Sequence, residues 1–560
     1  MHRFIPAAAY FGVLLLAACG PTGDGPDRIL HNGRVWTGDS ANPEVQALAI
    51  TGDRIVAVGT DAEVRTLRGR NTLIEDLGGR RVVPGFHDAH MHFPARRTAD
   101  LTDAAGPEEI VARLQAFAED LPADAWLTGR GWTPVAFPEQ RPHRRFLDAA
   151  FPDRPVLITD RDGHLALANT AALALAEVMS TTPDPAGGEI GRDADGAPTG
   201  LLKEGAAMRL VSRLIPPPGI DEVYAGFMAE MHRMAALGLT AVQVANAPSD
   251  ALTQALNRAV EADSMLLRVR IAVPFSAAAH DSVITRYLYQ HRAHQGPYLR
   301  YGVAKGMLDG TVDGGTAAML APFATGEGSG IPMWEQEELN RTVARYHSGG
   351  IQVQLHAIGD RAIRMALDAF EYAQRVSGPG ERRHRVEHLE VPAPLDLPRF
   401  AALGVVASTQ AIFVTPDATT LTNYAPKLGP ERAARAMPFR SLDDAGAIQA
   451  FGSDYPVFPI SPLLGIYTAV TRQLPDGIPP GGWYPDERIS VEAALRHYTW
   501  GSAYAAVREH ELGTLAPGKL ADFVVLSTDI FSGPLSGLLD AEVLLTVMGG
   551  RETHRAPRWP

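Results

Sequence analysis

Two histidines separated by a single residue are the first candidates for chemistry. They are His90 and His92, and the segment Pro84–His92 that carries them begins with an apolar stretch. Side chains alternate along a β-strand, so both imidazoles would point to the same side of such a strand. Two imidazoles on one face suit a divalent metal such as zinc. A pair of this kind also arises by chance or from core packing, so the structural interpretation stays open at this point.

Three more residues of ligand type follow strand-like segments further along the chain. His356 follows the apolar run 351–355, His388 closes the segment 385–388, and Asp454 follows Phe451-Gly452-Ser453. Each lies at the carboxyl end of an expected strand, where barrel enzymes place their sites. Taken singly, each histidine could be a core residue and the aspartate a helix N-cap. Packing explains the whole set poorly, because buried imidazoles need polar partners.

Lys305 lies in the mostly apolar segment Tyr301–Asp309. A buried lysine is costly unless it is paired or neutral. One interpretation is a salt bridge to Asp309 or a side chain that reaches out to solvent. The alternative is an amine that reacts with carbon dioxide to form a carbamate, an anionic group whose two oxygens can bridge two metals.

These residues occur in motifs that resemble those of the amidohydrolase superfamily and, within it, amidohydrolase family 3, the YtcJ-like branch. The resemblance covers nearly everything from residue 29 to residue 550. The motifs, in the order of the family, are Pro-Gly-Phe-x-Asp-Ala-His-x-His, Val-x-Lys-x-x-x-Asp-Gly, His-Ala-Ile-Gly-Asp-Arg-Ala, Arg-Val-Glu-His, Gly-Ser-Asp-x-Pro and the closing Gly-Thr-Leu-Ala-Pro-Gly-Lys-Leu-Ala-Asp.

The resemblance implies two divalent metal ions, usually Zn2+. His90 and His92 would hold the more buried ion together with Asp454, and His356 and His388 would hold the outer ion. The carboxylated lysine and a hydroxide would bridge the two. The sequence departs from the family after the lysine, where Gly-Met-Leu-Asp-Gly-Thr-Val-Asp-Gly-Gly stands in place of a stretch that often contains Ser-Leu-Gly-Ser-Arg. The missing arginine puts the usual substrate contacts of that loop in doubt.

The chemistry expected of such a centre is hydrolysis of a non-peptide carbon–nitrogen bond in an amide, N-substituted formamide, cyclic amide or carbamate. Asp454 would act as general base towards the nucleophile and then as general acid towards the leaving nitrogen. Three alternatives stay open: a mononuclear deaminase or cyclic-amide hydrolase of the same superfamily, a catalytically silent lipoprotein that binds small molecules, and isomerisation of an N-acyl substrate.

Candidate substrate contacts are fewer and less specific. They are Trp132, Asp162, His164, Asn169 and Gln410, with Ser408 as a weaker candidate. The first four fall in an expected insertion, where Asp162-Gly163-His164 could equally be a turn with a capped histidine. The expected partner is therefore a small-molecule amide, and homo-oligomerisation is left open.

Strand-like and helical segments alternate through the middle of the chain, which predicts an α/β fold, a (β/α)8 TIM barrel, over residues 84–504. The expected strands are 82–87, 240–244, 267–273, 301–308, 351–356, 385–389, 405–408 and 448–452; helices are expected at 221–237, 335–347 and 361–376. Residues 94–225 are predicted to form a large insertion after the first barrel strand. Strand-rich residues 29–83 and 505–555 would form one small β-sandwich domain from both chain ends.

Composition excludes several other classes of protein. The 560 residues include 51 basic and 64 acidic side chains, a formal charge of −13, and the chain has no long basic run, so nucleic acid is a poor partner. The single cysteine excludes an intrachain disulfide and a thiolate zinc cluster.

That cysteine, Cys19, follows a short basic start and an apolar run from Phe4 to Ala18. This pattern predicts a signal peptide over residues 1–18. Leu16-Ala17-Ala18-Cys19 resembles a bacterial lipoprotein box, which implies cleavage before Cys19, a lipid on its sulfur and a tether over residues 19–28. The protein is then expected to be exported and anchored at the cell envelope, on the periplasmic face of an outer membrane, with no other membrane contact. An ordinary signal peptide with a chance cysteine is the alternative.

Overall fold

The computed structural model describes residues 25–559 apart from residues 95, 120, 123, 280 and 327. The predicted signal peptide and Cys19 lie outside the described residues. Within the described ranges, no helix combines the length and the apolar character needed to cross a membrane.

Eight parallel strands form the central sheet, in the spatial order β21-β20-β19-β18-β17-β16-β15-β8. Their bounds are β8 Phe86–Met91, β15 Leu239–Val244, β16 Arg268–Pro274, β17 Leu299–Met307, β18 Gln352–Ala357, β19 Arg385–His388, β20 Val406–Gln410 and β21 Gln449–Gly452. The two outer strands meet, because β21 lies against β8 and the backbone N–H of Asp454 donates to the carbonyl of His90 at 2.7 Å. The sheet therefore closes as a barrel, as predicted.

The predicted first strand, 82–87, is wrong as a single element. Residues Arg81–Pro84 form β7, which pairs with the terminal sheet, and the barrel strand β8 starts only at Phe86. Gly85 separates the two, and a Cβ there would lie 2.3 Å from Oγ1 of Thr240. A residue with a side chain would therefore collide with β15 at the point where the chain passes from one domain to the other.

Amphipathic helices cover the outside of the barrel, as strand–helix alternation requires. The longest, α10 (Asp360–Ser377), buries Ile363, Leu367 and Phe370 against the sheet. The three predicted helices are found within one residue of their expected bounds, and Gly238 (φ +84°) follows the first of them. The other main helices are α6 Ile220–Ala236, α7 Asp250–Glu261, α8 Asp281–Ala293, α9 Gln336–Ser348, α11 Leu397–Leu403, α15 Pro462–Thr471 and α16 Val491–Arg496.

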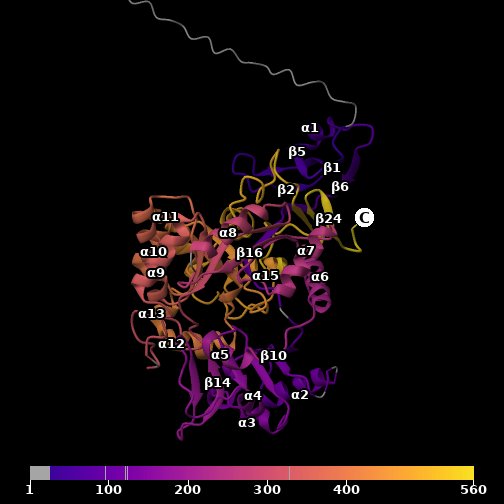
Figure 1. The fold of residues 1–560 in the computed structure, drawn as a ribbon. Helices are drawn as coiled ribbons and strands as arrows, with labels where there is room; N and C mark the ends of the chain where they lie inside the picture. The colour runs from indigo at the N-terminus through magenta and orange to yellow at the C-terminus, as the bar shows by residue number, and fades with distance from the viewer. Residues whose placement is uncertain are drawn as a thin grey trace, which may run out of the picture.

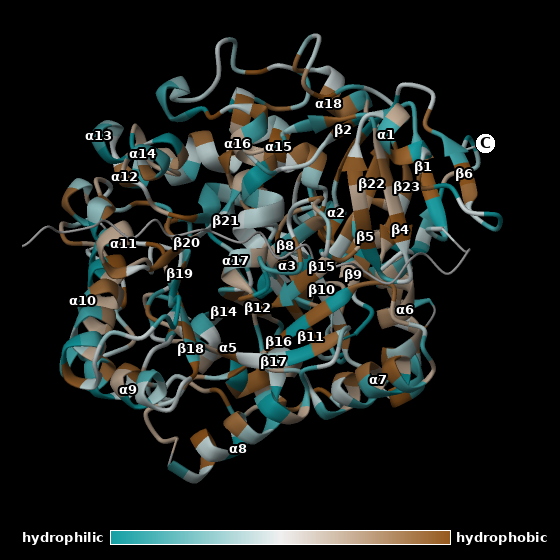
Figure 2. Cartoon of the chain, turned by 90° about the horizontal axis from the view of Figure 1, so that it is seen from above, coloured by the Kyte–Doolittle hydropathy of each residue, from teal (hydrophilic) through white to brown (hydrophobic). Residues whose placement is uncertain are grey.

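Both ends of the chain build a two-sheet β domain. One sheet has the order β5-β4-β1-β6 and the other β24-β23-β22-β7-β2-β3. Apolar side chains from both termini share its core, for example Val35, Val82, Phe523 and Val547, and Figure 2 shows the hydrophobic colour along β22 and β23. The bounds are β1 Arg28–His31, β2 Arg34–Trp36, β3 Glu44–Val45, β4 Ala47–Thr51, β5 Arg54–Gly59, β6 Leu73–Asp76, β22 Phe523–Leu526, β23 Val543–Met548 and β24 Arg551–Arg555.

The insertion after β8 is a separate layer with its own sheet, in the order β13-β14-β12-β11-β10-β9. Figure 1 shows it on the opposite side of the barrel from the terminal β domain. Its elements are β9 Ala99–Asp100, α2 Pro107–Ala118, β10 Leu127–Trp132, α3 Arg145–Asp148, β11 Val156–Asp160, β12 Leu165–Ala168, α4 Thr170–Leu175, β13 Glu189–Arg192, β14 Pro198–Lys203 and α5 Glu204–Ser212. Its residues Asp162 and His164 line one pocket together with Asp454, so the insertion faces the end of the barrel at which the ligand-type residues emerge.

Candidate metal centre and active site

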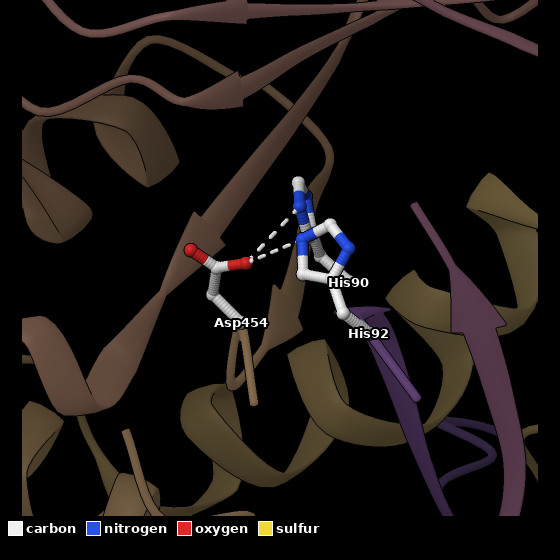
Figure 3. Close-up of side chains that lie close together, drawn as sticks. All are labelled: His90, His92 and Asp454. Carbon is white, nitrogen blue, oxygen red and sulfur yellow. Dashed lines mark ion pairs between the residues drawn. The ribbon is translucent and has the colours of Figure 1, made fainter. Parts of the chain in front are cut away.

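His90, His92 and Asp454 converge at the carboxyl ends of β8 and β21 (Figure 3). Their ligand atoms all lie within 4.8 Å of one another. Oδ1 of Asp454 is 3.0 Å from Nε2 of His92 and 3.4 Å from Nε2 of His90. Asp454 has a left-handed backbone (φ +55°), an unusual conformation for a non-glycine residue that turns its carboxylate back over the barrel mouth.

His356 and His388 lie directly beside this group. Their ring centroids are 4.4 Å apart, and the His388 ring is 4.8 Å from that of His90. In β19 the side chains of Arg385 and Glu387 face the barrel interior, so regular alternation would turn His388 outwards. A positive φ of +72° at His388 changes the direction of the chain and places its imidazole over the same centre.

Each of the four imidazoles uses one ring nitrogen for a hydrogen bond to a protein acceptor, and the other ring nitrogens of His90 and His92 face Asp454. The acceptors are Glu387 Oε2 for Nδ1 of His90, Asn246 Oδ1 for Nδ1 of His92 at 2.9 Å, Gln410 Oε1 for Nδ1 of His388 at 3.0 Å and the Gly310 carbonyl for Nε2 of His356 at 3.2 Å. An acceptor fixes the proton on the nitrogen that it contacts, so the opposite nitrogen presents a lone pair.

The convergence of these lone pairs fits a metal ion. Burial lowers the pKa of His90, His356 and His388 well below the usual range, which keeps the imidazoles neutral. Oδ1 of Asp454 is buried and makes no hydrogen bond to any described residue. Neutral imidazole nitrogens and a carboxylate oxygen that face one another repel unless a cation lies between them. Nitrogen and oxygen donors of this kind suit zinc and related divalent ions.

Lys305 enters the same centre from β17, with Nζ 3.5 Å from Nε2 of His90. The salt bridge to Asp309 does not form, because that carboxylate accepts backbone N–H groups of Ala318, Ile358 and Gly359 at 2.9–3.0 Å. Among the described residues, no carboxylate lies within 4.0 Å of Nζ. Burial lowers the pKa of Lys305 to about 8, which increases the fraction of neutral amine.

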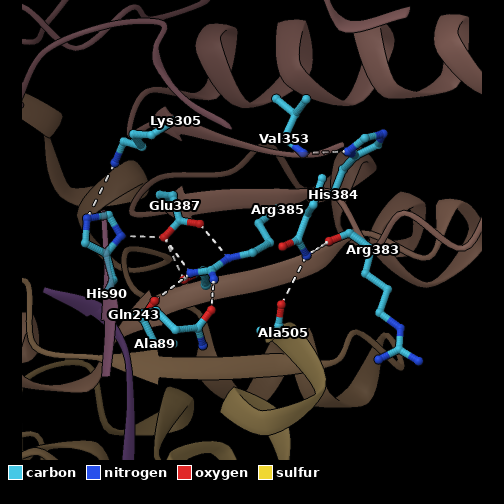
Figure 4. A network of polar contacts seen from close by, with 12 residues as sticks. Ala89, His90, Gln243, Lys305, Val353, Arg383, His384, Arg385, Glu387 and Ala505 are labelled. Carbon is cyan, nitrogen blue, oxygen red and sulfur yellow. Dashed lines mark hydrogen bonds and ion pairs between the residues drawn. The ribbon is translucent and has the colours of Figure 1, made fainter. Parts of the chain in front are cut away.

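A buried ion pair lies directly beneath the centre (Figure 4). Nε of Arg385 donates to Oε1 of Glu387 at 2.8 Å, and both side chains are fully buried. The guanidinium also donates to the Ala89 carbonyl, to Oε1 of Gln243 and to Oγ of Ser408. The carboxylate is thereby fixed where it contacts His90.

A small cavity lies beside the candidate ligands, between the barrel and the insertion. Apolar side chains supply much of its wall, including Phe413 and Phe458, whose rings lie 4.9 Å apart. Phe413 also stacks on His388 at 6.0 Å. The aromatic wall of the cavity therefore adjoins His356, His388 and Asp454.

Polar side chains of the insertion, including Arg161 and Asp162, line one side of this cavity. Arg161 lies 2.9 Å from Asp417, 3.2 Å from Asp162 and 3.8 Å from Asp313, and its guanidinium is 4.6 Å from the Phe458 ring centre. These carboxylates raise the pKa of Arg161 although burial opposes them. The arginine therefore connects the insertion to barrel loops after β17, β20 and β21.

Two of the five predicted substrate contacts, Asp162 and His164, line the cavity. Burial lowers the pKa of His164, but the Glu204 carboxylate outweighs it and raises the value to about 9. Trp132 is wrong as a contact, because it is buried in the core of the insertion against Phe137. Asn169 is wrong as well, since its side chain caps α4 and binds the backbone of residues 151–156.

Gln410 and Ser408 also lie outside the cavity wall. Gln410 holds Nδ1 of His388, and Ser408 donates to Glu387 at 2.8 Å. Sequence reasoning missed Glu387, Asn246, Glu204 and Arg161. For Glu387 and Glu204 alone, the sequence held a pattern that could have indicated a functional role: each is a charged residue at the end of an apolar strand.

Comparison with known proteins agrees with this geometry. The model of the amidohydrolase family matches residues 73–554. The protein LONG AFTER FAR-RED 3 of Arabidopsis thaliana is 33% identical, with 95% of this chain and 92% of its own length covered. N-substituted formamide deformylase of Arthrobacter pascens is 29% identical over 94% of this chain and 97% of its own. The crystal structure of an uncharacterized metal-dependent hydrolase from Pyrococcus horikoshii is 26% identical, with a TM-score of 0.70 over 91% of this chain and 99% of that one.

Proposed function

This chain belongs to the amidohydrolase family, and from that membership we propose that it hydrolyses a non-peptide carbon–nitrogen bond in a small amide, N-substituted formamide, cyclic amide or carbamate. It is a metal-dependent hydrolase that acts on carbon–nitrogen bonds. The observation that carries the proposal is the convergence of His90, His92 and the Asp454 carboxylate, with His356 and His388 directly beside them, next to a cavity. The similarity to a formamide deformylase supports the substrate class.

We propose two divalent ions at this centre, in keeping with the donors present. Nε2 of His90, Nε2 of His92 and Asp454 would hold one ion, and Nδ1 of His356 and Nε2 of His388 the other. Carboxylated Lys305 would bridge them, because its amine reaches the centre and has no carboxylate partner among the described residues. Bound metal supplies Lewis-acid polarisation of the carbonyl group and a water that ionises near neutral pH.

Asp454 is the group placed to move protons. It would accept the proton of the attacking water and deliver it to the leaving nitrogen, since an amine leaves far more readily than an amide anion. Burial raises the pKa of its carboxyl, but the neighbouring His90, His92 and Lys305 outweigh burial and lower it, so the base form prevails at neutral pH. Phe413 and Phe458 keep bulk water away from the reacting atoms, and Arg161 holds the insertion above them.

A mononuclear hydrolase is the second candidate. It is favoured by the fact that only His90, His92 and Asp454, among the described residues, form a compact group of His, Cys, Asp or Glu ligand atoms. In that case the chemistry would need neither a carbamate nor a second ion. Metal stoichiometry separates the two candidates.

The test loads purified protein with Zn2+ and measures metal by mass spectrometry, together with turnover of a panel of N-alkyl formamides, acetamides, cyclic amides and carbamates. We expect two ions per chain and turnover of at least one amide-type compound. One ion per chain would favour the mononuclear centre. Metal-loaded protein without turnover on the whole panel would contradict the proposed hydrolysis.

We also propose that the mature chain starts at Cys19 and is lipid-anchored at the cell envelope, as the motif around that residue predicts. Expression with a radiolabelled fatty acid tests this proposal. We expect the label in the wild type and none in Cys19→Ser. Equal labelling of both proteins would show that the lipid is not on Cys19, and labelling of neither would favour an ordinary signal peptide.

A further inference from the structure

The loop after the first helix of the terminal β domain carries positive charge and apolar side chains on its surface. Residues 65–73 leave α1 (Asp61–Arg65) and lead into β6, and they include three arginines, two leucines and no acidic residue. The arginines are exposed, and the leucines are exposed to 42% and 56%. We call this segment the basic loop; its charged and apolar members are Arg65, Arg68, Arg70, Leu67 and Leu73.

The positive charge of the basic loop is not neutralised within the part of the chain that the structure describes. None of the three guanidinium groups has a carboxylate within 4.0 Å or a hydrogen-bond acceptor there. The neighbouring carboxylates along the chain contact other groups: Glu63 accepts the backbone N–H of Thr60 at 2.9 Å, and Glu75 pairs with Arg28 at 2.6 Å. The loop therefore presents charge to a partner outside the chain.

The basic loop lies directly against the segment that leads to Cys19. A Cβ on Gly25 would be 2.3 Å from the backbone nitrogen of Gly69 and 2.4 Å from the carbonyl oxygen of Leu67, so the two backbones are in contact. Cys19 precedes Gly25 by six positions, so the chain between them spans at most about 20 Å. A lipid on Cys19 therefore brings the basic loop close to the surface of the bilayer.

Local contacts fix the basic loop to the β domain. Val64, the residue just before it, is buried against β1 and β4. The N–H of Leu73 donates to the carbonyl of Asp27 at 2.9 Å, and the N–H of Gly69 donates to Oγ1 of Thr72 at 2.9 Å. Because these contacts already order the loop, binding to a surface costs less conformational entropy than it would for an unstructured segment.

We propose that the basic loop docks on the surface of a bilayer that contains anionic phospholipids, with its arginines at the lipid phosphates and its leucines at the interface. This inference rests on the proposed lipid anchor at Cys19. It goes beyond the expectation from the sequence, in which the lipid is the only membrane contact. Guanidinium groups bind phosphate through paired hydrogen bonds, and apolar side chains insert at the boundary between headgroups and acyl chains.

Charge also selects the end of the molecule that meets the bilayer. The whole chain has a formal charge of −13, so an anionic surface repels most of the protein and attracts the basic loop. α1 lies at the end of the molecule that is farthest from the insertion (Figure 1). The cavity beside the candidate ligands lies between the barrel and the insertion. Docking through the basic loop therefore leaves this cavity on the side away from the bilayer.

The test places one fluorophore on the lipidated protein. Cys19 is the only cysteine and its sulfur carries the lipid, so Leu67→Cys supplies the only free thiol for an environment-sensitive dye. The labelled protein is added to preformed vesicles of phosphatidylcholine and phosphatidylglycerol that contain a lipid with a nitroxide on its headgroup. We expect quenching that disappears in phosphatidylcholine alone and weakens at about 0.5 M salt, because salt screens the charges. The matched control is Met179→Cys, on an apolar residue of the insertion that is 60% exposed, and it should show no quenching.

Removal of the arginines tests the role of charge. Arg65→Ser/Arg68→Ser/Arg70→Ser in the labelled protein should lower the ratio of docked to undocked molecules by about 100-fold, because each arginine near an anionic surface contributes about fivefold. The protein should stay on the vesicles through its lipid. A control variant removes the same charge from exposed positions of the insertion and should leave the quenching unchanged. Its substitutions are Arg141→Ser/Arg209→Ser/Arg213→Ser.

Three results would overturn the inference and leave the lipid anchor intact. They are equal quenching in Leu67→Cys and Met179→Cys, equal quenching in vesicles without phosphatidylglycerol, and unchanged quenching after removal of the three arginines of the basic loop. If Leu67→Cys does not fold, the same measurements on Leu73→Cys decide. A wild-type protein without a fatty-acid label would remove the anchor and this inference together, whereas the proposed hydrolysis is decided separately by the amide panel.

Discussion

Nδ1 of His90 contacts Oε2 of Glu387, and Arg385 holds the same carboxylate from its other side. The ion pair lies in the floor of the barrel, wholly excluded from solvent. A carboxylate behind a ligating imidazole fixes its tautomer and raises its basicity. Two strands distant in sequence, β8 and β19, thus together orient one candidate ligand, His90.

Glu387→Leu should weaken Zn2+ binding by about 10–100-fold, because His90 loses the acceptor for its Nδ1 hydrogen. It should also lower the free energy of unfolding by about 3–5 kcal/mol, since Arg385 stays buried without a counter-ion. Arg385→Leu/Glu387→Leu should regain stability but not metal affinity. Chelator competition and urea unfolding measure the two effects. Glu509→Gln, which breaks the Arg383 pair away from the centre, is the control. Normal metal affinity in Glu387→Leu would contradict the ligand-orienting role.

Asp454→Asn should retain most of the bound metal and lose at least about 10³-fold in kcat, because an amide oxygen can still ligate but the side chain no longer transfers a proton. Steady-state rates with metal analysis on the same samples check this. Asp443→Asn, which alters the contact to His497 outside the cavity, should keep wild-type rates. Near-normal turnover in Asp454→Asn would show that another group moves the protons.

Lys305→Ala should lose metal and activity, and millimolar acetate or formate should restore part of both by replacing the carbamate oxygens. Metal content with and without the acid provides the measurement. The matched control is Lys519→Ala, because Lys519 donates to the backbone carbonyls of Glu509 and Leu512, away from the centre. This variant should neither lose metal nor respond to the added acid. Full metal occupancy in Lys305→Ala, with no response to acid, would rule out a bridging carbamate.

Stability should fall as pH drops below about 6.5, partly through His384. Burial lowers the pKa of His384 to about 3, and the ring stacks on Phe370 at 4.7 Å. Its folded pKa lies below the unfolded value, so the unfolded chain binds the extra proton between these two values and stability rises with pH in that window. From pH 7 to pH 5 this single group should cost about 2 kcal/mol. Urea unfolding at both values, for wild type and His384→Gln, measures the difference. An identical pH dependence in the variant would assign the effect to other groups.

Local patterns were sufficient for the barrel. Alternating apolar strands and amphipathic helices carry period and capping information within short windows, and the helix 361–376 is found as α10 within one residue at each end. The prediction of the first barrel strand failed because residues 82–86 contain no polar side chain that would mark a boundary. Only pairing of Arg81–Pro84 with β22 decides that this segment belongs to the terminal sheet.

The predicted substrate contacts also show that local sequence patterns do not decide which residues reach the cavity. Trp132 and His164 both follow strand-like segments of the insertion, yet one packs in its core and the other reaches the cavity. Polarity and position along the chain do not distinguish a capping asparagine such as Asn169 from a substrate contact. That distinction depends on which backbone groups lie nearby after folding.

By itself, the sequence determined the family, the barrel and the kinds of donor atom available, because these follow from side-chain chemistry and from spacing within short motifs. The tertiary structure alone decided which nitrogen of each imidazole is free, that Glu387 lies behind His90 and Glu204 behind His164, and which part of the insertion covers the cavity. The physical reason is that hydrogen bonds and charge compensation in a buried site depend on contacts between residues tens to hundreds of positions apart, and no local pattern encodes those contacts.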